Sequence, residues 1–250
     1  MYVQNSVILI TGASRGIGKA FAEEFLKQGA KKIYLGMLNP KNVNYFYGEK
    51  KFTPLKLDVT NLDQVRSAAS KARDTTILIN NAGVIHKGGL LDQNRIKNAQ
   101  HEMAVNYFGS LAMIHAFSSI LKSNGGGVIV NISSIAGLVA MPGAPTYSAS
   151  KAAVHFLTME ARMELRSQGS TQVIGVYPGP VDTDMIRSPH LPKVTARHVA
   201  RETINGIEAG RDYIFPDPDL KDIYAIFHDH QPLPIQKDNR KDRKPEARAA

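Results

Sequence analysis

The chain has 250 residues, of which 43% are hydrophobic and 21% charged, and it contains no cysteine. This composition is ordinary for a folded globular protein, and the length fits one large domain better than two. The lack of cysteine excludes disulfides, thiolate nucleophiles, iron–sulfur clusters and cysteine-bound zinc. We expect no metal centre, because only His228 and His230 are close in sequence and no HExxH spacing occurs.

No continuous apolar run approaches the roughly 20 residues that span a bilayer, so we expect no membrane-spanning segment and no membrane partner. The first strand-like segment begins at Ser6 and leads directly into a glycine-rich turn. This pattern places the N-terminus inside the fold and not in a secretory signal. We therefore expect an unexported, cytoplasmic protein.

The formal net charge of +9 gathers partly at the C-terminus, where residues 237–250 contain six basic and three acidic residues. Residues 232–250 are poor in apolar side chains and contain three prolines, a composition that favours disorder. We expect a folded domain over 1–231 and a disordered basic tail over 232–250. The tail has no aromatic residue for base stacking, so we expect no nucleic-acid partner.

Short β-branched runs alternate with longer amphipathic stretches, which is typical of βαβ units around a parallel sheet. The pattern predicts a single α/β domain with a doubly wound, mainly parallel sheet and helices on both faces. The expected strands are 6–10, 32–36, 52–58, 76–80, 127–132, 172–177 and 212–215, and the expected helices are 16–28, 62–72, 94–122, 146–168 and 196–209.

A glycine-rich turn, TGASRGIG at 11–18, joins the first strand to the first helix. Glycines in this context let backbone amides and a helix N-terminus approach a pyrophosphate. The turn therefore predicts a dinucleotide site, with a tight turn that binds no ligand as the alternative. Its candidate cofactor-binding residues are Gly12, Ser14, Arg15, Gly16, Ile17 and Gly18.

The end of the second strand is expected to approach the adenosine ribose. It reads GMLN at 36–39 and lacks the carboxylate that would repel a 2′-phosphate, while the glycine turn carries the cation Arg15. We therefore expect NADP(H) to be favoured, with NAD(H) possible.

Tyr147 and Lys151 are four residues apart in a predicted helix and so share one face. A nearby cation favours the phenolate, so we expect Lys151 to lower the pKa of Tyr147 from about 10 towards neutrality. A tyrosine tuned in this way can carry a proton. The spacing alone is weak evidence, because Tyr47 and Lys51 share it within a polar stretch.

Ser133 and Ser134 follow the predicted strand 127–132, at the sheet edge where parallel sheets bind ligands. A hydroxyl there can orient a substrate oxygen. Capping of a helix or turn is the alternative for this pair.

Taken in order, these motifs resemble the short-chain dehydrogenase/reductase family over roughly residues 6–215. The resemblance implies a Rossmann-like fold with seven strands, and an oxidoreductase that transfers hydride between a nicotinamide cofactor and a carbonyl or secondary alcohol. The motifs that carry it are the turn 11–18, Asp58-Val59, Asn80-Asn81-Ala82-Gly83, Asn106, Ser134, Tyr147 with Lys151, and Pro178-Gly179.

The resemblance also implies roles for individual residues. Tyr147 is then the general acid/base, and Ser134 rather than Ser133 holds the substrate oxygen. Lys151 lowers the pKa of Tyr147 and binds the nicotinamide ribose, while Asn106 holds a water that links Lys151 to solvent. The further residues implied to lie along the cofactor are Asp58, Val59, Asn80, Ala82, Gly83, Pro178, Gly179, Val181 and Thr183.

Several of these features have a structural alternative. Asp58 can cap a turn, and the segment 80–83 can be a structural turn. His86 can edge the site or lie in a solvated loop, and the apolar segment 135–143 can line a substrate pocket or belong to the core. The loop 184–195 resembles the family's variable substrate loop, and the two long helices resemble those through which family members form homodimers or homotetramers.

Three classes of function remain: an active oxidoreductase, a dinucleotide-binding regulator without turnover, and a nucleic-acid or membrane binder that uses the tail. The joint presence of Ser134, Tyr147 and Lys151 favours the first, because a regulator has no need of them. Among enzymes, an epimerase or dehydratase of related fold is the alternative.

Overall fold

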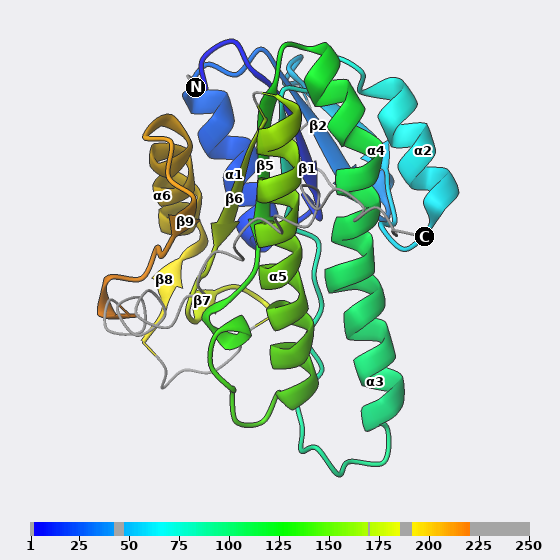
Figure 1. Ribbon diagram of the computed structural model, residues 1–250, viewed down its shortest axis with the longest axis vertical. Coiled ribbons are helices and arrows are strands. Elements are labelled where there is room, and N and C mark those ends of the chain that lie inside the picture. The colour runs from blue at the N-terminus through cyan, green and yellow to red at the C-terminus, as the bar shows by residue number, and fades with distance from the viewer. Residues whose placement is uncertain (1–2, 43–47, 170, 186–191, 221–250) are drawn as a thin grey trace, which may run out of the picture.

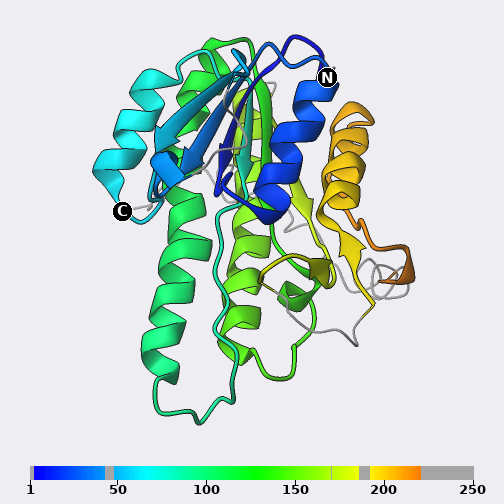
Figure 2. The ribbon, with the colours of Figure 1, turned by 180° about the vertical axis from the view of Figure 1, so that it is seen from behind.

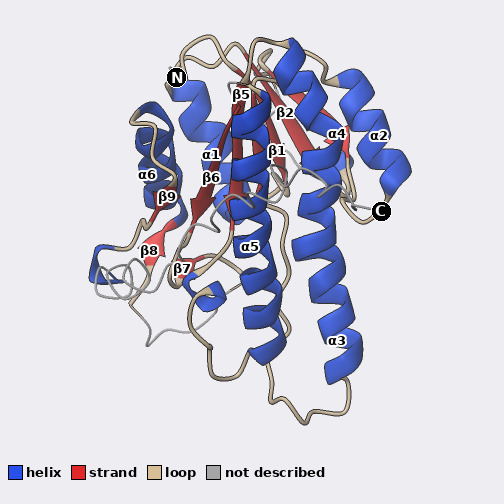
Figure 3. Cartoon of the chain, in the orientation of Figure 1, coloured by secondary structure: helices blue, strands red, loops and turns tan. Residues whose placement is uncertain are grey.

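The computed structural model describes residues 3–42, 48–169, 171–185 and 192–220. All seven predicted strands form one sheet in the order β3-β2-β1-β4-β5-β6-β9, and each neighbouring pair is parallel (Figures 1 and 3). The strands are β1 (Val7–Thr11), β2 (Lys32–Met37), β3 (Phe52–Lys56), β4 (Ile77–Asn80), β5 (Gly127–Ile132), β6 (Thr171–Val176) and β9 (Tyr213–Ile214).

Helices cover both faces of the sheet. Figures 1 and 2 show α1 (Gly16–Lys27) and α6 (Ala196–Glu208) on one face, and α2 (Leu62–Lys71), α4 (Gly109–Ser123) and α5 (Pro145–Gln168) on the other. Alternation along β1 builds both cores, because Ile8 and Ile10 pack with the first pair of helices while Val7 and Leu9 pack with the other three. This arrangement confirms the predicted Rossmann-like, doubly wound α/β fold.

The predicted helix 94–122 is continuous but not uniform. It consists of α3 (Arg95–Glu102), a π-helical turn η2 (Met103–Phe108) and α4. By length and composition this helix, Arg95–Ser123, is long and apolar enough to cross a membrane, although no such segment is expected from the sequence. Core helices pass the same test, and here Met113, Phe117 and Leu121 are fully buried against the sheet.

Beyond the carboxyl edge of the sheet, α3 and the first half of α5 extend away from the strands (Figure 1). A two-stranded sheet of β7 (Val181–Asp182) and β8 (Val194–Thr195), which was not predicted, lies in the same part of the molecule. The short 3-10 turns are η1 (Pro40–Asn42), η3 (Ile135–Gly137) and η4 (Pro218–Leu220). Residues 186–191 of the predicted substrate loop and the whole predicted tail 232–250 lie outside the described residues.

Candidate active site

The carboxyl ends of β1, β4, β5 and β6 meet at one edge of the sheet, where the strand order reverses between β1 and β4. Thr11 ties two of these ends together. Its Oγ1 accepts hydrogen bonds from the amides of Asn81 and Ala82, both at 3.0 Å, and donates to the carbonyl of Ile79 at 3.3 Å. The predicted glycine turn, the segment 80–83, Ser134 and Pro178 therefore all begin at this edge.

The glycine turn packs directly against the backbone that follows β4. Gly12 has a φ of +66°, and a Cβ there would lie 3.0 Å from the Cα of Ala82. A Cβ on Gly18 would lie 2.3 Å from the carbonyl oxygen of Gly12. A side chain at either position would strain the turn, because backbone lies unusually close to backbone here.

Helix α1 begins immediately after this turn without a cap. Arg15, at the N-cap position, makes no side-chain cap hydrogen bond, and the first turn of the helix has no acidic residue. The partial positive charge of the helix N-terminus is therefore not neutralised locally. Together with the close glycine packing, this fits the phosphates of a dinucleotide at the predicted residues, namely Gly12, Ser14, Arg15, Gly16, Ile17 and Gly18.

Arg15 has a partner that the sequence did not indicate. Its Nη1 lies 3.3 Å from Oδ2 of Asp184, and both side chains are exposed. The same loop reaches Gly16, where a Cβ would lie 3.3 Å from Cγ2 of Thr183. A 2′-phosphate at Arg15 must compete with a carboxylate, which weakens this part of the sequence argument for NADP(H).

The end of β2 offers another cation. Leu38 is 68% exposed, and the side-chain oxygen of Asn39 accepts a hydrogen bond from the amide of Lys41 at 3.2 Å. This turn places the exposed Lys41 beside the strand end and contains no carboxylate. Lys41 is a candidate contact for a 2′-phosphate that the sequence analysis missed, although its position two residues after Asn39 was a usable signal.

Asp58 and Val59 both have structural partners. Asp58 Oδ1 accepts hydrogen bonds from the amide and the hydroxyl of Thr60, at 2.9 and 2.7 Å. Val59 is buried, and its Cγ2 would lie 2.5 Å from a Cβ on Gly109. Asp58 is therefore a turn cap, and contact of either residue with adenine stays a prediction.

The segment after β4 links the cofactor side of the site to the catalytic side. Asn80 donates from Nδ2 to Oδ1 of Asn131 at 2.9 Å, which joins β4 to β5. Ala82 packs against Gly12, and a Cβ on Gly83 would lie 3.5 Å from Nζ of Lys151. Gly83 therefore brings the backbone beside Lys151. The hydrogen bond of Asn80 shows that this segment also has the structural role expected as the alternative.

Ser134, Tyr147 and Lys151 converge at the end of β5. Nζ of Lys151 lies 5.7 Å from the centre of the Tyr147 ring and donates to the carbonyl of Ile132 at 2.7 Å. The hydroxyl of Ser134 lies close enough to Tyr147 to favour its phenolate through a hydrogen bond. Ser133 instead donates to the carbonyl of Lys151 at 2.9 Å, so Ser134 is the serine that faces the tyrosine.

The pKa of Tyr147 does not follow the sequence expectation. Burial raises it to about 12, the Ser134 hydroxyl lowers it, and the carboxyl of Glu102 raises it. Burial also lowers the pKa of Lys151 to about 8. The expected lowering by Lys151 is wrong for this structure, because desolvation dominates and the ammonium is hydrogen-bonded to the carbonyl of Ile132.

Asn106 lies buried in the π-helical turn η2, a kind of turn often found at functional sites. Its Oδ1 accepts from the amide of Val84 at 2.8 Å, and its Nδ2 donates to the carbonyl of Val84 at 3.0 Å and to Ser150 Oγ at 2.8 Å. The side chain thus fastens the segment after β4 to α5. The water-holding role stays a prediction that these side-chain hydrogen bonds do not support.

The loop after β6 runs from Ser134 to the glycine turn. The carbonyl of Pro178 accepts from the hydroxyl of Ser134 at 3.3 Å. A Cβ on Gly179 would lie 2.8 Å from Oδ2 of Asp217. Val181 is buried and belongs to β7. Thr183 contacts Gly16 as described above, so this loop spans both halves of the site.

A side-chain cluster on α3 holds the segment after Gly83 and was largely missed from the sequence. The amide of His86 donates to Glu102 Oε1 at 2.7 Å, and its carbonyl accepts from Arg95 at 2.9 Å. Arg95 is 4% exposed and also donates to Thr146 Oγ1 at 3.2 Å, next to Tyr147. His86 therefore lies at the edge of the site, in a segment bound to both α3 and α5.

The apolar segment 135–143 is only partly core. Ala136 is buried, whereas Val139 is 43% exposed. The carbonyl of Gly143 accepts from the amide of Gly88 at 2.8 Å, so the segment lies beside the loop that carries His86. The exposed part of 135–143 thus lies beside the loop that carries His86, and its lining of a substrate pocket stays a prediction.

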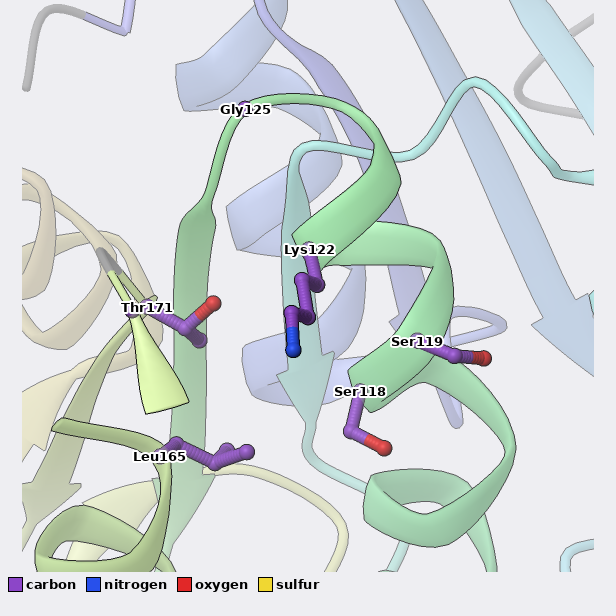
Figure 4. A pocket seen from close by; sticks show the side chains of 7 residues that line it. Ser118, Ser119, Lys122, Gly125, Leu165 and Thr171 are labelled. Carbon is purple, nitrogen blue, oxygen red and sulfur yellow. The ribbon is translucent and has the colours of Figure 1, made fainter. Parts of the chain in front are cut away.

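A separate hollow of about 490 Å³ lies at the opposite, amino edge of the strands (Figure 4). None of the predicted site residues lines it. Its lining residues are Ser118, Ser119, Lys122, Gly125, Leu165, Gly169 and Thr171.

Comparison with known proteins agrees with this geometry. The sequence pattern of the short chain dehydrogenase family matches residues 6–191. The chain belongs to the short-chain dehydrogenase/reductase family. It is 34% identical over 188 residues to the short-chain dehydrogenase srdE of Neurospora crassa, a match that covers 73% of this chain and 63% of that relative.

Two solved structures of family members are similar over nearly the whole chain. A short chain dehydrogenase of Burkholderia cenocepacia in complex with NADP is 38% identical, with a TM-score of 0.86 over 91% of this chain and 94% of that one. A family member from Burkholderia phymatum in complex with NAD is 26% identical, with a TM-score of 0.80 over 94% of this chain and 100% of that one. The family thus includes both NADP and NAD complexes at this level of similarity.

Proposed function

We propose that the protein is an oxidoreductase that interconverts a carbonyl and a secondary alcohol and prefers NADP(H) to NAD(H). The observation that carries this proposal is the convergence of Ser134, Tyr147 and Lys151 at the edge of the sheet that also bears the glycine turn. A regulator that only binds a dinucleotide needs the turn alone. The three side chains add the groups that proton transfer to an oxygen requires.

In this mechanism the residues of the chain hold the substrate and move the proton. Ser134 and Tyr147 both donate to the substrate oxygen and stabilise the charge that develops on it. During reduction the Tyr147 hydroxyl gives its proton to that oxygen, and during oxidation the phenolate takes it back. Lys151 holds the nicotinamide ribose. A bound nicotinamide cofactor would supply the hydride chemistry.

The preference for NADP(H) has support on three counts. The end of β2 lacks a carboxylate, Lys41 lies exposed beside it, and the Burkholderia cenocepacia relative binds NADP. The pairing of Arg15 with Asp184 acts against this preference. We infer that the balance favours NADP(H), because the glycine turn and the end of β2 each carry an exposed cation, Arg15 and Lys41, and only Arg15 pairs with the carboxylate of Asp184.

A panel of secondary alcohols and carbonyl compounds, each measured with NADP(H) and with NAD(H), tests this proposal. We expect turnover with at least one substrate class and a higher kcat/KM with the phosphorylated cofactor. Tight cofactor binding without turnover across the panel would instead favour the regulator. Formation of product without net oxidation or reduction of the cofactor would favour an epimerase or dehydratase.

We further propose that the protein forms a homo-oligomer through α4 and α5. Figure 1 shows these helices next to each other. Exposed large apolar side chains lie on both: Leu111 on α4, directly after the exposed Phe108 that ends η2, and Phe156 and Met163 on α5. Burial of such side chains between copies is favourable. Sedimentation should give the mass of a dimer or tetramer for the parent and a smaller mass for Phe156→Asp. Equal masses would contradict this proposal.

A further inference from the structure

Tyr177 is a buried tyrosine that the proposed mechanism does not use. It is 0% exposed and directly follows β6, next to Pro178. Its phenol folds back over Gly175, because a Cβ on Gly175 would lie 2.5 Å from the phenol oxygen and 2.8 Å from two ring carbons. Gly175 therefore leaves the space in β6 that the ring fills.

The phenol oxygen of Tyr177 connects the end of β6 to helix α5. It lies 2.7 Å from Nδ1 of His155, a side chain that is 5% exposed and one helical turn after Lys151. Burial lowers the pKa of His155 to about 4, so the imidazole is uncharged near neutral pH. The hydrogen bond therefore joins two neutral groups over the pH range in which the protein would be assayed.

The ring and the main chain of Tyr177 are also held by β9 and the residue that follows it. The ring stacks on Phe215, with ring centres 5.1 Å apart and an angle of 18° between the planes. The amide of Tyr177 donates to the carbonyl of Ile214 at 2.9 Å. Tyr177 is thus fixed from two sides, by His155 on α5 and by the end of β9.

The residue after Tyr177 presents its carbonyl to the proposed active site. The Pro178 carbonyl accepts hydrogen bonds from the amide of Ile135 at 3.0 Å and from the hydroxyl of Ser134 at 3.3 Å. The serine oxygen in turn accepts from the amide of Ala136 at 3.1 Å. Because hydrogen bonds weaken steeply with distance and angle, a shift of the Pro178 carbonyl would redirect the Ser134 hydroxyl.

We propose that Tyr177 and His155 are positioning residues for Ser134, a role that rests on the function proposed above. Their hydrogen bond fastens the end of β6 to α5, the helix that carries Tyr147. It thereby sets the position of the Pro178 carbonyl, and with it the direction of the Ser134 hydroxyl relative to Tyr147. Two donors that are meant for one substrate oxygen are kept in place before the substrate binds.

The first test measures amide hydrogen exchange at single residues, which needs no substrate. Tyr177→Phe removes the hydroxyl and keeps the ring. Tyr34→Phe is the matched control, because Tyr34 on β2 is 5% exposed and its hydroxyl is also hydrogen-bonded. The amide of Ile135 reports on the Pro178 carbonyl, and the amide of Val128, at the other end of β5, reports on the sheet.

We expect the ratio of the Ile135 exchange rate to the Val128 exchange rate to rise about tenfold in Tyr177→Phe. The ratio should stay at the parent value in Tyr34→Phe. His155→Leu should raise it as Tyr177→Phe does, whereas His155→Asn, which keeps a polar atom near the position of Nδ1, should leave it near the parent value. An unchanged ratio in either Tyr177→Phe or His155→Leu would overturn the proposal.

The second test uses turnover and asks whether Tyr177 acts through Ser134. With a substrate from the panel and saturating cofactor, Tyr177→Phe should lower kcat/KM about tenfold in the parent, but less than about twofold in a Ser134→Ala background. An equal loss in both backgrounds would overturn the proposal and leave the enzyme activity standing. Absence of turnover in the parent would refute the proposed function, while the exchange ratio still decides whether the pair holds the Pro178 carbonyl.

Discussion

The glycine turn and the segment 84–102 are two halves of one site, and they are built in different ways. The turn is held by backbone contacts, such as the approach of Gly18 to the carbonyl of Gly12, within a few residues of one another. The segment 84–102 is held by side chains. Arg95 donates a hydrogen bond to the carbonyl of His86, and Glu102 accepts one from the amide of His86. Backbone architecture of the first kind leaves a motif in the sequence, whereas side-chain architecture of the second kind leaves almost none.

The difference also separates two tasks. A turn made of backbone recognises what all dinucleotides share, namely their phosphates. In the proposed mechanism, the side chains around Tyr147 would determine which substrate fits and at which pH the proton moves. Changes in one half should therefore alter cofactor binding, and changes in the other should alter turnover and substrate affinity.

The largest effect is expected from Tyr147→Phe. Loss of the hydroxyl removes the proton carrier without changing the fold, so kcat should fall about 10³-fold. Cofactor affinity, measured by fluorescence titration, should stay within about twofold of the parent. Tyr47→Phe is the control, because Tyr47 and Lys51 share the spacing of Tyr147 and Lys151 by chance. Its kcat should equal that of the parent. A near-normal rate in Tyr147→Phe would refute the role assigned to this residue.

Gly18→Ala should have the opposite profile. A Cβ at this position would lie 2.3 Å from the carbonyl oxygen of Gly12, so the turn must open. We expect cofactor affinity to fall by about one to two orders of magnitude and the free energy of unfolding by about 1–3 kcal/mol. In Gly89→Ala the nearest atom is the flexible Asp92 side chain at 3.3 Å, which makes it a mild control. If Gly18→Ala bound cofactor normally, the turn would not be the phosphate site.

Arg95→Ala tests the half of the site that side chains build. Arg95 is buried and donates to the carbonyls of His86 and Gly89 and to Thr146, so its loss should lower the free energy of unfolding by about 2–4 kcal/mol. KM for the substrate should rise, while the affinity for the cofactor should stay at the parent value.

Arg66→Ala is the matched control for Arg95→Ala. Arg66 also pairs with an aspartate three residues earlier, but at the exposed surface, so its loss should cost less than about 1 kcal/mol. Chemical denaturation measures the free energy of unfolding of both variants. Equal losses of this free energy would show that the buried hydrogen bonds around His86 do not contribute to stability.

The sequence was informative where the structure depends on local patterns. The seven strands were found because each is a short apolar run followed by a turn, and the edge at which they end predicted that Ser134, Tyr147 and the glycine turn meet. The pair β7 and β8 was missed because each strand has only two residues. The π-helical turn η2 was missed because its residues keep a helical pattern.

The parts of the site that the sequence did not reveal depend on distant partners. Arg95 and Thr146 are 51 positions apart, and charged residues on a helix normally face solvent. The direction of the Tyr147 pKa was wrong because spacing shows that Lys151 is near but not that the phenol is desolvated. Likewise, nothing local to Arg15 shows that Asp184 approaches it.

The smallest predicted effect concerns the choice between NADP(H) and NAD(H). Exposed charges each contribute about 0.2–1 kcal/mol, so Lys41→Ala should lower the ratio of NADP(H) to NAD(H) affinity a few-fold. Asp184→Asn should raise the same ratio a few-fold, because it frees Arg15 from its carboxylate partner. Lys50→Ala, another exposed lysine in the stretch before β3, is the control and should leave the ratio unchanged.

Titration of both cofactors at two salt concentrations tests this pair of opposite shifts. Raised salt should shrink both shifts, since exposed charges are screened. A ratio that fell in Lys41→Ala but did not rise in Asp184→Asn would place the 2′-phosphate at the end of β2 alone. Arg15 would then have no part in binding the 2′-phosphate, and its only role would be the exposed ion pair with Asp184. Unchanged ratios in both variants would remove the basis for preferring NADP(H), because the missing carboxylate at 36–39 excludes neither cofactor.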